Sequence, residues 1–244
     1  MQTYVFEECD AVDKCYPRGF YGVDKIGRPI YLDCTGKIDI SGLFKAASEE
    51  NLMRDRFMIY ERCVKFFITA CSALYDRQIL QLFSIIDLTG FSMALWQKKT
   101  IRLLKQCLKV NSDYYPEIMG KMVICNGPAV FTGLWSIIKG WIDEKTRKKI
   151  VVVGNPTKIL SEYIDMDNLP TFMGGKNEQV LTDNHGPWNE YELVDSSDPD
   201  AIVGIKRKDD PLGRIFTPHD ACMLENPCIE GIGISGTKGA MVTS

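Results

Sequence analysis

Cys71 and Arg77 come closest in this chain to a spacing known from catalysis, because they form the Cys-x5-Arg pattern of cysteine phosphatases. In such a site a thiolate is the nucleophile, and the amides of a glycine-rich loop hold the phosphate. The residues between Cys71 and Arg77 include no glycine. Cys71 also falls on the apolar stripe of a predicted helix, where a thiol is buried and unreactive. We therefore expect no phosphatase chemistry.

Other catalytic and metal-binding patterns are missing from the sequence. It has no Gly-x-Ser-x-Gly elbow and no Walker loop. The two histidines, His185 and His219, are far apart and no CxxC pair exists, so we expect no metal site. Asp87 follows an apolar strand, where α/β proteins gather ligand sites, but we favour a role in capping the next helix. The sequence thus predicts a protein that is not an enzyme.

The composition is that of a globular protein, with 45% hydrophobic and 25% charged residues in 244. A net charge of −3 gives no basic field that would indicate nucleic-acid binding. No apolar run is long enough for a transmembrane helix, and the acidic N-terminus lacks the apolar core of a signal peptide. Nine cysteines, an odd number, favour reduced thiols in a cytosolic protein.

Strands and helices alternate along the chain. The apolar run 80–87 reads as a strand buried on both faces, and shorter strands are expected at 30–33, 122–125 and 150–153. Helices are expected from 48 onward, at 92–110 and at 156–164. The first of these helices has one continuous apolar face: Met53, Phe57, Tyr60, Val64, Phe67, Cys71 and Leu74. This alternation predicts a mainly parallel sheet with helical crossovers.

Residues 129–142 form a predicted helix with almost no polar face. An all-round apolar helix must be buried or in contact with lipid, and about 14 residues are too few to span a bilayer, which needs about 20. One interpretation is an ordinary core helix. The other is a cover over an oily ligand that also touches a membrane. The residues that would form such a cover are Phe131, Leu134, Trp135, Ile138 and Trp141.

Several short motifs occur in a fixed order over about 175 residues: Tyr16-Pro17, Gly27-Arg28-Pro29-Ile30-Tyr31, Tyr114-Tyr115-Pro116-Glu117, Asn126-Gly127-Pro128, Gly174-Gly175-Lys176 and Gly186-Pro187-Trp188. With the apolar helix they resemble the CRAL-TRIO lipid-binding domain, most closely the secretory-pathway phosphatidylinositol/phosphatidylcholine transfer proteins. The resemblance implies an α/β fold with a mainly parallel sheet flanked by helices, a large apolar lipid cavity and a mobile gate helix at 129–142. We place this domain at residues 12–195 and expect 196–244 to be a partly flexible extension.

The resemblance also implies a headgroup site. Glu117 and Lys149 would bind inositol lipid together, with Thr146 donating a hydroxyl. An ammonium suits a phosphate, and a carboxylate can hold the ammonium and accept inositol hydroxyls. Without the resemblance, the residues alone favour a structural salt bridge at a helix–strand junction. The neighbouring basic side chains either are solvated or strengthen contact with an anionic membrane: Lys145, Arg147 and Lys148.

Family members that bind choline lipid place hydroxyls at five positions. Three match here, at Tyr31, Tyr60 and Ser84, whereas Phe20 replaces a tyrosine and Leu82 replaces a serine. We therefore expect phosphatidylcholine to be bound more weakly than phosphatidylinositol. The alternative is ordinary core packing for the tyrosines and a backbone hydrogen bond for Ser84.

Together these features imply a protein that binds phospholipid and transfers it between membranes without catalysis, with bound phospholipid as its ligand and no cofactor. Its partners would be phospholipid and, transiently, a membrane surface. Golgi and endosomal membranes are candidates for a cytoplasmic protein that associates peripherally. Two alternatives stay open: a carrier or sensor of a sterol or isoprenoid, and a membrane-recruitment module without transfer activity. No motif identifies a downstream lipid kinase.

Overall fold

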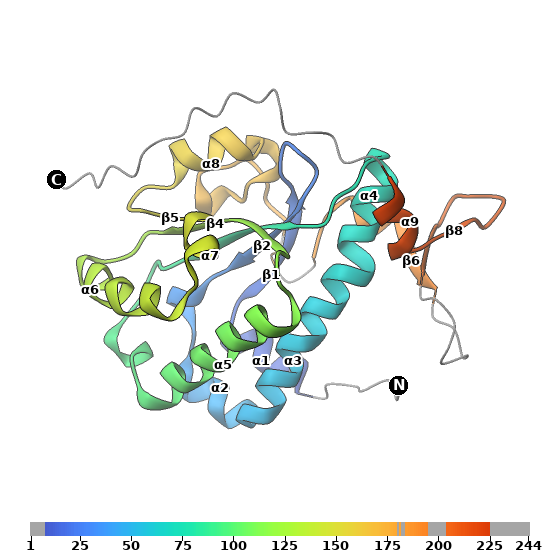
Figure 1. Ribbon diagram of the computed structural model, residues 1–244. Helices are drawn as coiled ribbons and strands as arrows, with labels where there is room; N and C mark the ends of the chain where they lie inside the picture. Colours follow the sequence, from blue (N-terminus) through green and yellow to red (C-terminus); the bar gives the residue numbers. More distant parts are fainter. Residues whose placement is uncertain (1–7, 180, 182–183, 195–203, 225–244) are drawn as a thin grey trace.

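A five-stranded sheet forms the centre of the computed structural model, which describes residues 8–179, 181, 184–194 and 204–224 (Figure 1). Its strands follow one another in chain order: β1 (Arg18–Val23), β2 (Pro29–Asp33), β3 (Leu82–Asp87), β4 (Met119–Cys125) and β5 (Ile150–Val153). β1 is antiparallel to β2, and the later neighbours are parallel. The predicted α/β fold with a mainly parallel sheet is confirmed, and β1 is a strand that was not predicted.

Helices cover both faces of this sheet (Figure 1). On one face α8 (Thr157–Tyr163) packs through Leu160, which shares a buried cluster with Phe83 and Val123. The other face, which we call the cavity face, is covered by a layer of longer helices: α3 (Glu49–Arg62), α4 (Thr69–Tyr75), α5 (Lys98–Tyr114) and α6 (Ala129–Ile138). Three shorter helices complete this side: α1 (Cys9–Cys15), α2 (Ile40–Ala46) and α7 (Glu144–Lys148).

Side chains along β3 alternate between the two faces of the sheet, as the pleat requires. Phe83 and Ile85 are fully buried in the cluster beneath α8. Leu82, Ser84 and Ile86 point to the cavity face, where they line a hollow. The alternation therefore places Ser84, the polar residue in this apolar strand, on the side of the cavity.

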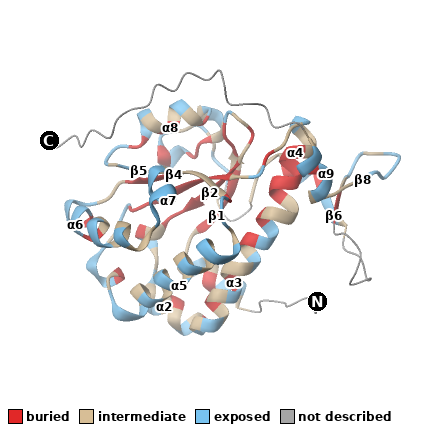
Figure 2. Cartoon of the chain, viewed as in Figure 1, coloured by how far each residue is buried: buried red, intermediate tan, exposed pale blue. Residues whose placement is uncertain are grey.

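The predicted long helix is present and runs from α3 through a π-helical segment, Cys63–Ile68, into α4. The Ser48 hydroxyl accepts a hydrogen bond from the Asn51 amide and caps the start. The hydroxyl of Thr69, the first residue of α4, donates back to the carbonyl of Val64 in the π segment at 3.0 Å. Buried positions concentrate in the central strands, along α4 and on one side of α3 (Figure 2). The π segment was not predicted, because hydrophobic spacing does not distinguish it from an α-helix.

The helix predicted at 92–110 begins and ends later than expected. A 3₁₀ turn, Met93–Leu95, comes first, and α5 starts only after Gln97, whose backbone is extended (φ −104°, ψ 157°). Between them the ring of Trp96 stacks on that of Trp141, with centroids 6.3 Å apart and planes 5° from parallel. This stacking gives Trp96 a packing position that a continuous helix from residue 92 would not provide.

Asp87 does not cap the helix that follows β3, so that prediction was wrong. Its Oδ1 accepts hydrogen bonds from the amide and hydroxyl of Thr89, at 3.0 and 2.7 Å, and from the Asn126 amide group at 2.8 Å. Asp87 therefore fixes the turn after β3 and ties it to the end of β4.

A second sheet, which was not predicted, follows the first. It has three strands, β6 (Tyr191–Val194), β7 (Gly204–Arg207) and β8 (Ile215–Phe216), and is followed by α9 (Pro218–Met223). Tyr191 and Ile205 belong to the same buried cluster as Phe67. The predicted flexibility of the extension falls largely on 195–203 and 225–244, which lie outside the described residues. The boundary of the domain at residue 195 stays a prediction.

Trp188 anchors the segment between the two sheets. Its indole lies against the rings of Phe67 and Phe20, with centroid distances of 4.8 and 6.3 Å, and its ring N–H donates to the Asn184 carbonyl. A Cβ atom at Gly186 would come within 2.2 Å of this indole, so only glycine fits there. This packing gives a physical reason for the Gly-Pro-Trp motif.

A buried ion pair joins β1 to α3. The Arg18 guanidinium lies 2.5 Å from the Asp55 carboxylate, and the two side chains are 6% and 10% exposed. Arg18 also lies 3.7 Å from Asp13. Removing one member of a buried pair leaves an uncompensated charge, which costs far more than losing an exposed pair.

We expect Asp55→Ala to lower the free energy of unfolding by about 3 kcal/mol, because Arg18 would keep only the longer contact with Asp13. Urea unfolding followed by circular dichroism would measure the change. Asp113→Ala is a matched control, since Asp113 pairs with Lys109 on an exposed helix surface and should change stability by less than about 0.5 kcal/mol. Equal effects of the two substitutions would contradict this assignment.

Candidate functional site

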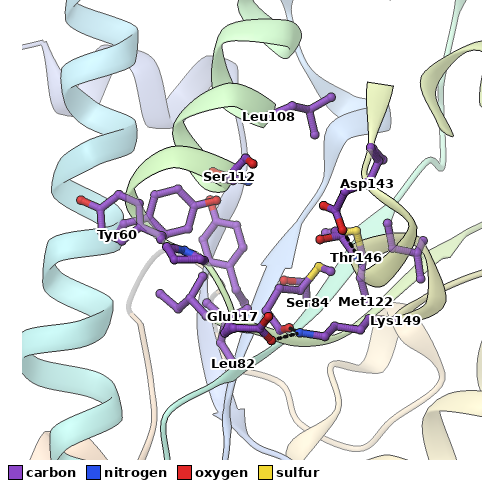
Figure 3. A pocket seen from close by; sticks show the side chains of 18 of the residues that line it. Tyr60, Leu82, Ser84, Leu108, Ser112, Glu117, Met122, Asp143, Thr146 and Lys149 are labelled. Carbon is purple, nitrogen blue, oxygen red and sulfur yellow. Dashed lines mark hydrogen bonds and ion pairs between the residues drawn. The ribbon is translucent and has the colours of Figure 1, made fainter. Parts of the chain in front are cut away.

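A cavity of about 460 Å³ lies between the cavity face of the sheet and helices α3, α5 and α7 (Figure 3). Its volume falls within the range of small-molecule sites, about 300–1,000 Å³. The structure brings to this one cavity all eight residues that were predicted for headgroup and pocket: Phe20, Tyr31, Tyr60, Leu82, Ser84, Glu117, Thr146 and Lys149. Their roles in binding stay predictions.

The floor of the cavity is a row of side chains in register across the sheet. Strand pairing sets Phe20 beside Tyr31, Tyr31 beside Ser84, Ser84 beside Met122, and Met122 beside Ile150. All five line the cavity. Two of them are polar, so a mostly apolar floor has hydroxyls near its middle.

Ser84 is buried, and no hydrogen bond of its hydroxyl occurs within the part of the chain that the structure describes. The alternative expected from the sequence, a backbone partner for this hydroxyl, is therefore not observed there. The close-up view shows Ser84 next to Met122 on the floor (Figure 3). A buried hydroxyl normally has a partner, so Ser84 is available to a polar group in the cavity.

Glu117 joins two lysines at the rim of the cavity. Lys149 Nζ donates to Glu117 Oε2 at 2.7 Å and to the Met119 carbonyl at 3.0 Å (Figure 3). Lys145 Nζ contacts the other carboxylate oxygen of Glu117. Hydrogen bonds from Lys145 and Lys149 hold the pKa of Glu117 below its usual range, so this carboxylate stays ionised at neutral pH. We call Glu117, Lys145 and Lys149 the rim.

The rim lies at the amino ends of two neighbouring parallel strands. Glu117 precedes β4, and Lys149 lies between α7 and β5. The Met122 amide donates to the Lys149 carbonyl at 3.0 Å, which fixes the two segments side by side. Ligand sites of open α/β sheets usually gather at the carboxyl ends of strands, so the rim is at the opposite edge.

Glu117 has an unusual backbone conformation. Its φ is +70°, in the left-handed region that few residues other than glycine adopt. Its carbonyl accepts a hydrogen bond from the Gln81 side chain at 3.1 Å. Such conformations persist where the surrounding structure enforces them and often occur at functional sites.

Thr146 lies in the cavity wall, within α7. Its amide donates to Asp143 Oδ1 at 2.8 Å. Hydrogen bonding from Thr146 holds the pKa of Asp143 below its usual range. The expected role of the Thr146 hydroxyl as a donor to a headgroup stays a prediction.

Arg56 is a cavity residue that was not predicted. Its guanidinium nitrogens approach the hydroxyls of Tyr60 at 2.9 Å and Tyr31 at 3.4 Å. We call Tyr31, Arg56 and Tyr60 the interior cluster. A sequence signal existed: Arg56 lies three residues after Met53 and four before Tyr60, so it interrupts the apolar stripe of the long helix.

The predicted gate helix is α6, and it is shorter than expected. It ends at Ile138, and a 3₁₀ turn, Lys139–Trp141, continues the segment. Phe131 and Leu134 are buried in a cluster with Leu88 and Ile124. Val130 and Ile137 flank Leu134 on the helix surface and are each 49% exposed, so the apolar surface of α6 extends beyond its buried side. Within the described residues, no helix is both long and apolar enough to cross a bilayer.

The cavity and the gate helix share a wall. Ile86, Met122 and Ile150 line the cavity and also pack against the cluster that holds α6. Trp135 and Ile138 of α6 are partly buried in that cluster, while Trp141 itself lines the cavity. Displacement of α6 would therefore uncover these apolar side chains and lengthen the cavity.

Cys71 is fully buried, and burial raises the pKa of its thiol. This is the opposite of what a thiolate nucleophile requires. The eight cysteines within the described residues are free thiols; Cys228 lies outside them.

Comparison with known protein families shows to which family this chain belongs. A family model described as CRAL/TRIO domain matches residues 13–175, which is more than half of the chain. The chain belongs to the CRAL/TRIO family. The matched segment includes the floor, the rim, the interior cluster and α6.

Similar proteins with curated names point in the same direction. The phosphatidylinositol/phosphatidylcholine transfer protein SFH7 of Arabidopsis thaliana is 36% identical over 80% of this chain and 37% of its own length. The Sec14 cytosolic factor of Schizosaccharomyces pombe is 31% identical over 81% of this chain and 70% of its own length. This chain spans only 37% to 57% of the length of SFH7 and the related Arabidopsis proteins SFH9 and SFH11.

Among solved structures, the crystal structure of Sfh5 matches with a TM-score of 0.54. The match covers 71% of this chain and 58% of the other, at 20% sequence identity. At this identity the likeness supports the fold alone.

We expect α6 of this CRAL/TRIO domain to open before the central sheet does, because elements with exposed apolar side chains and few buried contacts unfold locally at low cost. Hydrogen exchange read by mass spectrometry should show faster exchange in α6 than in β3. Adding phospholipid vesicles should accelerate exchange in α6 and leave β3 unchanged. Equally slow exchange in the two elements would show that α6 is a static core helix.

Proposed function

We propose that this domain binds a phospholipid and transfers it between membranes, and that phosphatidylinositol is the lipid recognised at the rim. The observation that supports this most is the position of Glu117 between Lys145 and Lys149, at the mouth of a cavity with a largely apolar floor. A phospholipid has the matching parts, namely an anionic headgroup and apolar chains.

The rim suits an inositol phosphate in two ways. Lys149 is 20% exposed, so its ammonium can contact a phosphate while Glu117 keeps it in position. The Glu117 side chain is half exposed and ionised, so it can accept hydrogen bonds from sugar hydroxyls. A structural salt bridge alone would not require that the pair face a cavity, which favours the headgroup role.

Transfer requires that a lipid enter and leave the cavity with little net change in free energy. Burying a methylene group gains about 0.8 kcal/mol relative to water. A lipid that moves from a bilayer into the cavity exchanges one apolar environment for another, so most of this gain cancels. In the proposal, α6 moves aside during contact with the membrane and closes again over the lipid.

The proposal also includes the compartment and the membranes at which the protein acts. It is a non-catalytic carrier in the cytoplasm that touches Golgi or endosomal membranes transiently. The name of the fission-yeast relative, a cytosolic factor, supports the compartment. The exposed Val130 and Ile137 of α6, with the basic side chains of α7 nearby in the sequence, support contact with an anionic membrane.

Phosphatidylcholine is proposed to be the weaker ligand. Phe20 and Leu82 present no hydroxyl to the cavity, and Phe20 is packed by Phe67, with ring centroids 4.2 Å apart. Each absent hydrogen bond is worth about 0.5–1.5 kcal/mol. Two such losses weaken a site by about ten- to a hundredfold.

We expect Lys149→Ala to lower phosphatidylinositol transfer about ten- to a hundredfold, the effect of losing one hydrogen bond to a charged group. The fold should be retained, because Lys149 lies at the rim. Transfer of labelled phosphatidylinositol between vesicles would measure the loss. Lys109→Ala is the matched control, since Lys109 is an exposed lysine on α5 that pairs with Asp113 and does not line the cavity; it should transfer normally.

Glu117→Gln should give a similar or smaller loss, because it weakens the hold on Lys149 without removing the ammonium. If the two residues act as one unit, the double variant should be no worse than Lys149→Ala. Normal phosphatidylinositol transfer by Lys149→Ala would exclude the role proposed for the rim.

A further inference from the structure

The interior cluster contains a positive charge without a neutralising partner. Arg56 lines the cavity, and its Nε is buried with no hydrogen-bond partner. Across the described residues, no carboxylate forms an ion pair with Arg56; its two polar contacts are the hydroxyls of Tyr31 and Tyr60. Buried charges in proteins are normally paired, so an unpaired guanidinium that lines a cavity is suited to bind an anionic group.

The nearby carboxylates are engaged elsewhere. Asp55 is adjacent in sequence but forms the buried pair with Arg18. Asp33 accepts hydrogen bonds of 2.6 Å from each of the hydroxyls of Tyr16 and Thr35. Burial raises the pKa of both Tyr31 and Tyr60, so their phenols stay neutral and do not compensate Arg56. The charge of Arg56 is therefore left for a ligand.

The same geometry disfavours a cationic ligand. The Arg56 guanidinium carbon lies 4.8 Å from the ring centre of Tyr60 and 5.6 Å from that of Tyr31. Aromatic rings attract a cation through their faces, and here the protein's own cation already uses them. A quaternary ammonium entering this part of the cavity would meet a like charge instead.

Asn111 supplies a complementary group. Its Oδ1 is buried in the cavity wall and has no hydrogen-bond partner among the described residues. Arg56 thus offers a charged donor, and Asn111 offers an acceptor, in one cavity. A phosphate monoester matches both, because it is anionic and, when singly protonated, also has an O–H to donate.

We propose that Arg56 and Asn111 form a second headgroup subsite, in the interior of the cavity, for a phospholipid whose headgroup is a phosphate monoester, that is, phosphatidic acid. This inference rests on the proposed phospholipid transfer but concerns a different lipid and different residues from the rim. It predicts that the domain selects phosphatidic acid over phosphatidylcholine, whose phosphate is a diester without an O–H to donate and which adds a quaternary ammonium.

The first test compares three labelled lipids at equal fractions in otherwise identical phosphatidylethanolamine vesicles. Wild-type protein should transfer phosphatidylinositol and phosphatidic acid, and phosphatidylcholine about tenfold or more slowly than phosphatidic acid. Transfer of phosphatidylinositol without phosphatidic acid would overturn this inference and leave the proposed function intact. Transfer of phosphatidylcholine as fast as phosphatidic acid would also overturn it. Transfer of no lipid would overturn both.

Substitutions test which residue is responsible for the selection of phosphatidic acid. Arg56→Met keeps the length of the side chain and removes its charge, so the ratio of phosphatidic acid to phosphatidylinositol transfer should fall about ten- to a hundredfold. Arg56→Lys should retain more of this ratio than Arg56→Met, and Lys149→Ala should raise it. Arg54→Met is the matched control, because Arg54 is on the same helix, half exposed and paired with Glu50; it should leave the ratio unchanged.

A thermal-unfolding measurement distinguishes a lipid from a free phosphate. Each variant is first checked for a cooperative transition, and Asn111→Leu replaces Arg56→Met if the latter does not fold. Short-chain phosphatidic acid should raise the Tm of the wild type and not that of Arg56→Met, while glycerol 3-phosphate at the same concentration should raise neither. An unchanged transfer ratio in both folded variants would overturn the subsite. A Tm increase with glycerol 3-phosphate, without transfer of phosphatidic acid, would assign the site to a soluble anion instead.

Discussion

The alternation of side chains along parallel strands separates two tasks in this domain. On one face of the sheet Phe83, Ile85 and Val123 are sealed beneath α8 and provide stability. On the other face, residues one position away in sequence form the floor of a cavity. Because a shift of register by one residue would exchange the two faces, strand pairing determines both the core and the binding surface. The helices on the cavity face therefore need to enclose space rather than fill it.

Charge in and around this cavity is arranged in three ways. Arg18 and Asp55 neutralise each other in the protein interior, where either charge alone would be costly. At the rim one carboxylate, Glu117, stands between two ammoniums, so the local balance is positive. Arg56 has only neutral phenols as polar contacts. Net positive charge is therefore found at the rim and at Arg56, both of which line the cavity. This charge orients an anionic headgroup.

Much of this arrangement could be predicted from the sequence. The apolar run at β3 and the periodic apolar face of the long helix are local hydrophobic patterns. The strand and the helix predicted from them are both present. The cavity residues were found through motif resemblance, because residues as distant as Phe20 and Lys149 meet only in the folded chain.

The errors have physical causes as well. Trp96 was misjudged because its partner, Trp141, is remote in sequence. Asp87 bonds both the nearby Thr89 and the remote Asn126, and only the bonds to Thr89 are local enough to be read from the sequence. The short strands of the second sheet owe their burial to a distant cluster around Phe67, so their local pattern was weak. Arg56 was not predicted, because one of its partners, Tyr31, is remote in sequence and meets it only in the folded chain.

The π-helical segment Cys63–Ile68 has a consequence for how this fold can vary. Each residue advances an α-helix by about 100°, so the wider turn changes the rotational phase between α3 and α4. The first half of the helix directs Arg56 and Tyr60 into the cavity, and the second half directs Cys71 into the core behind it. Deleting one residue between them would turn one half away from its partner. The length of this helix is therefore as constrained as its composition, and insertions or deletions in relatives should be found in the loops at its ends.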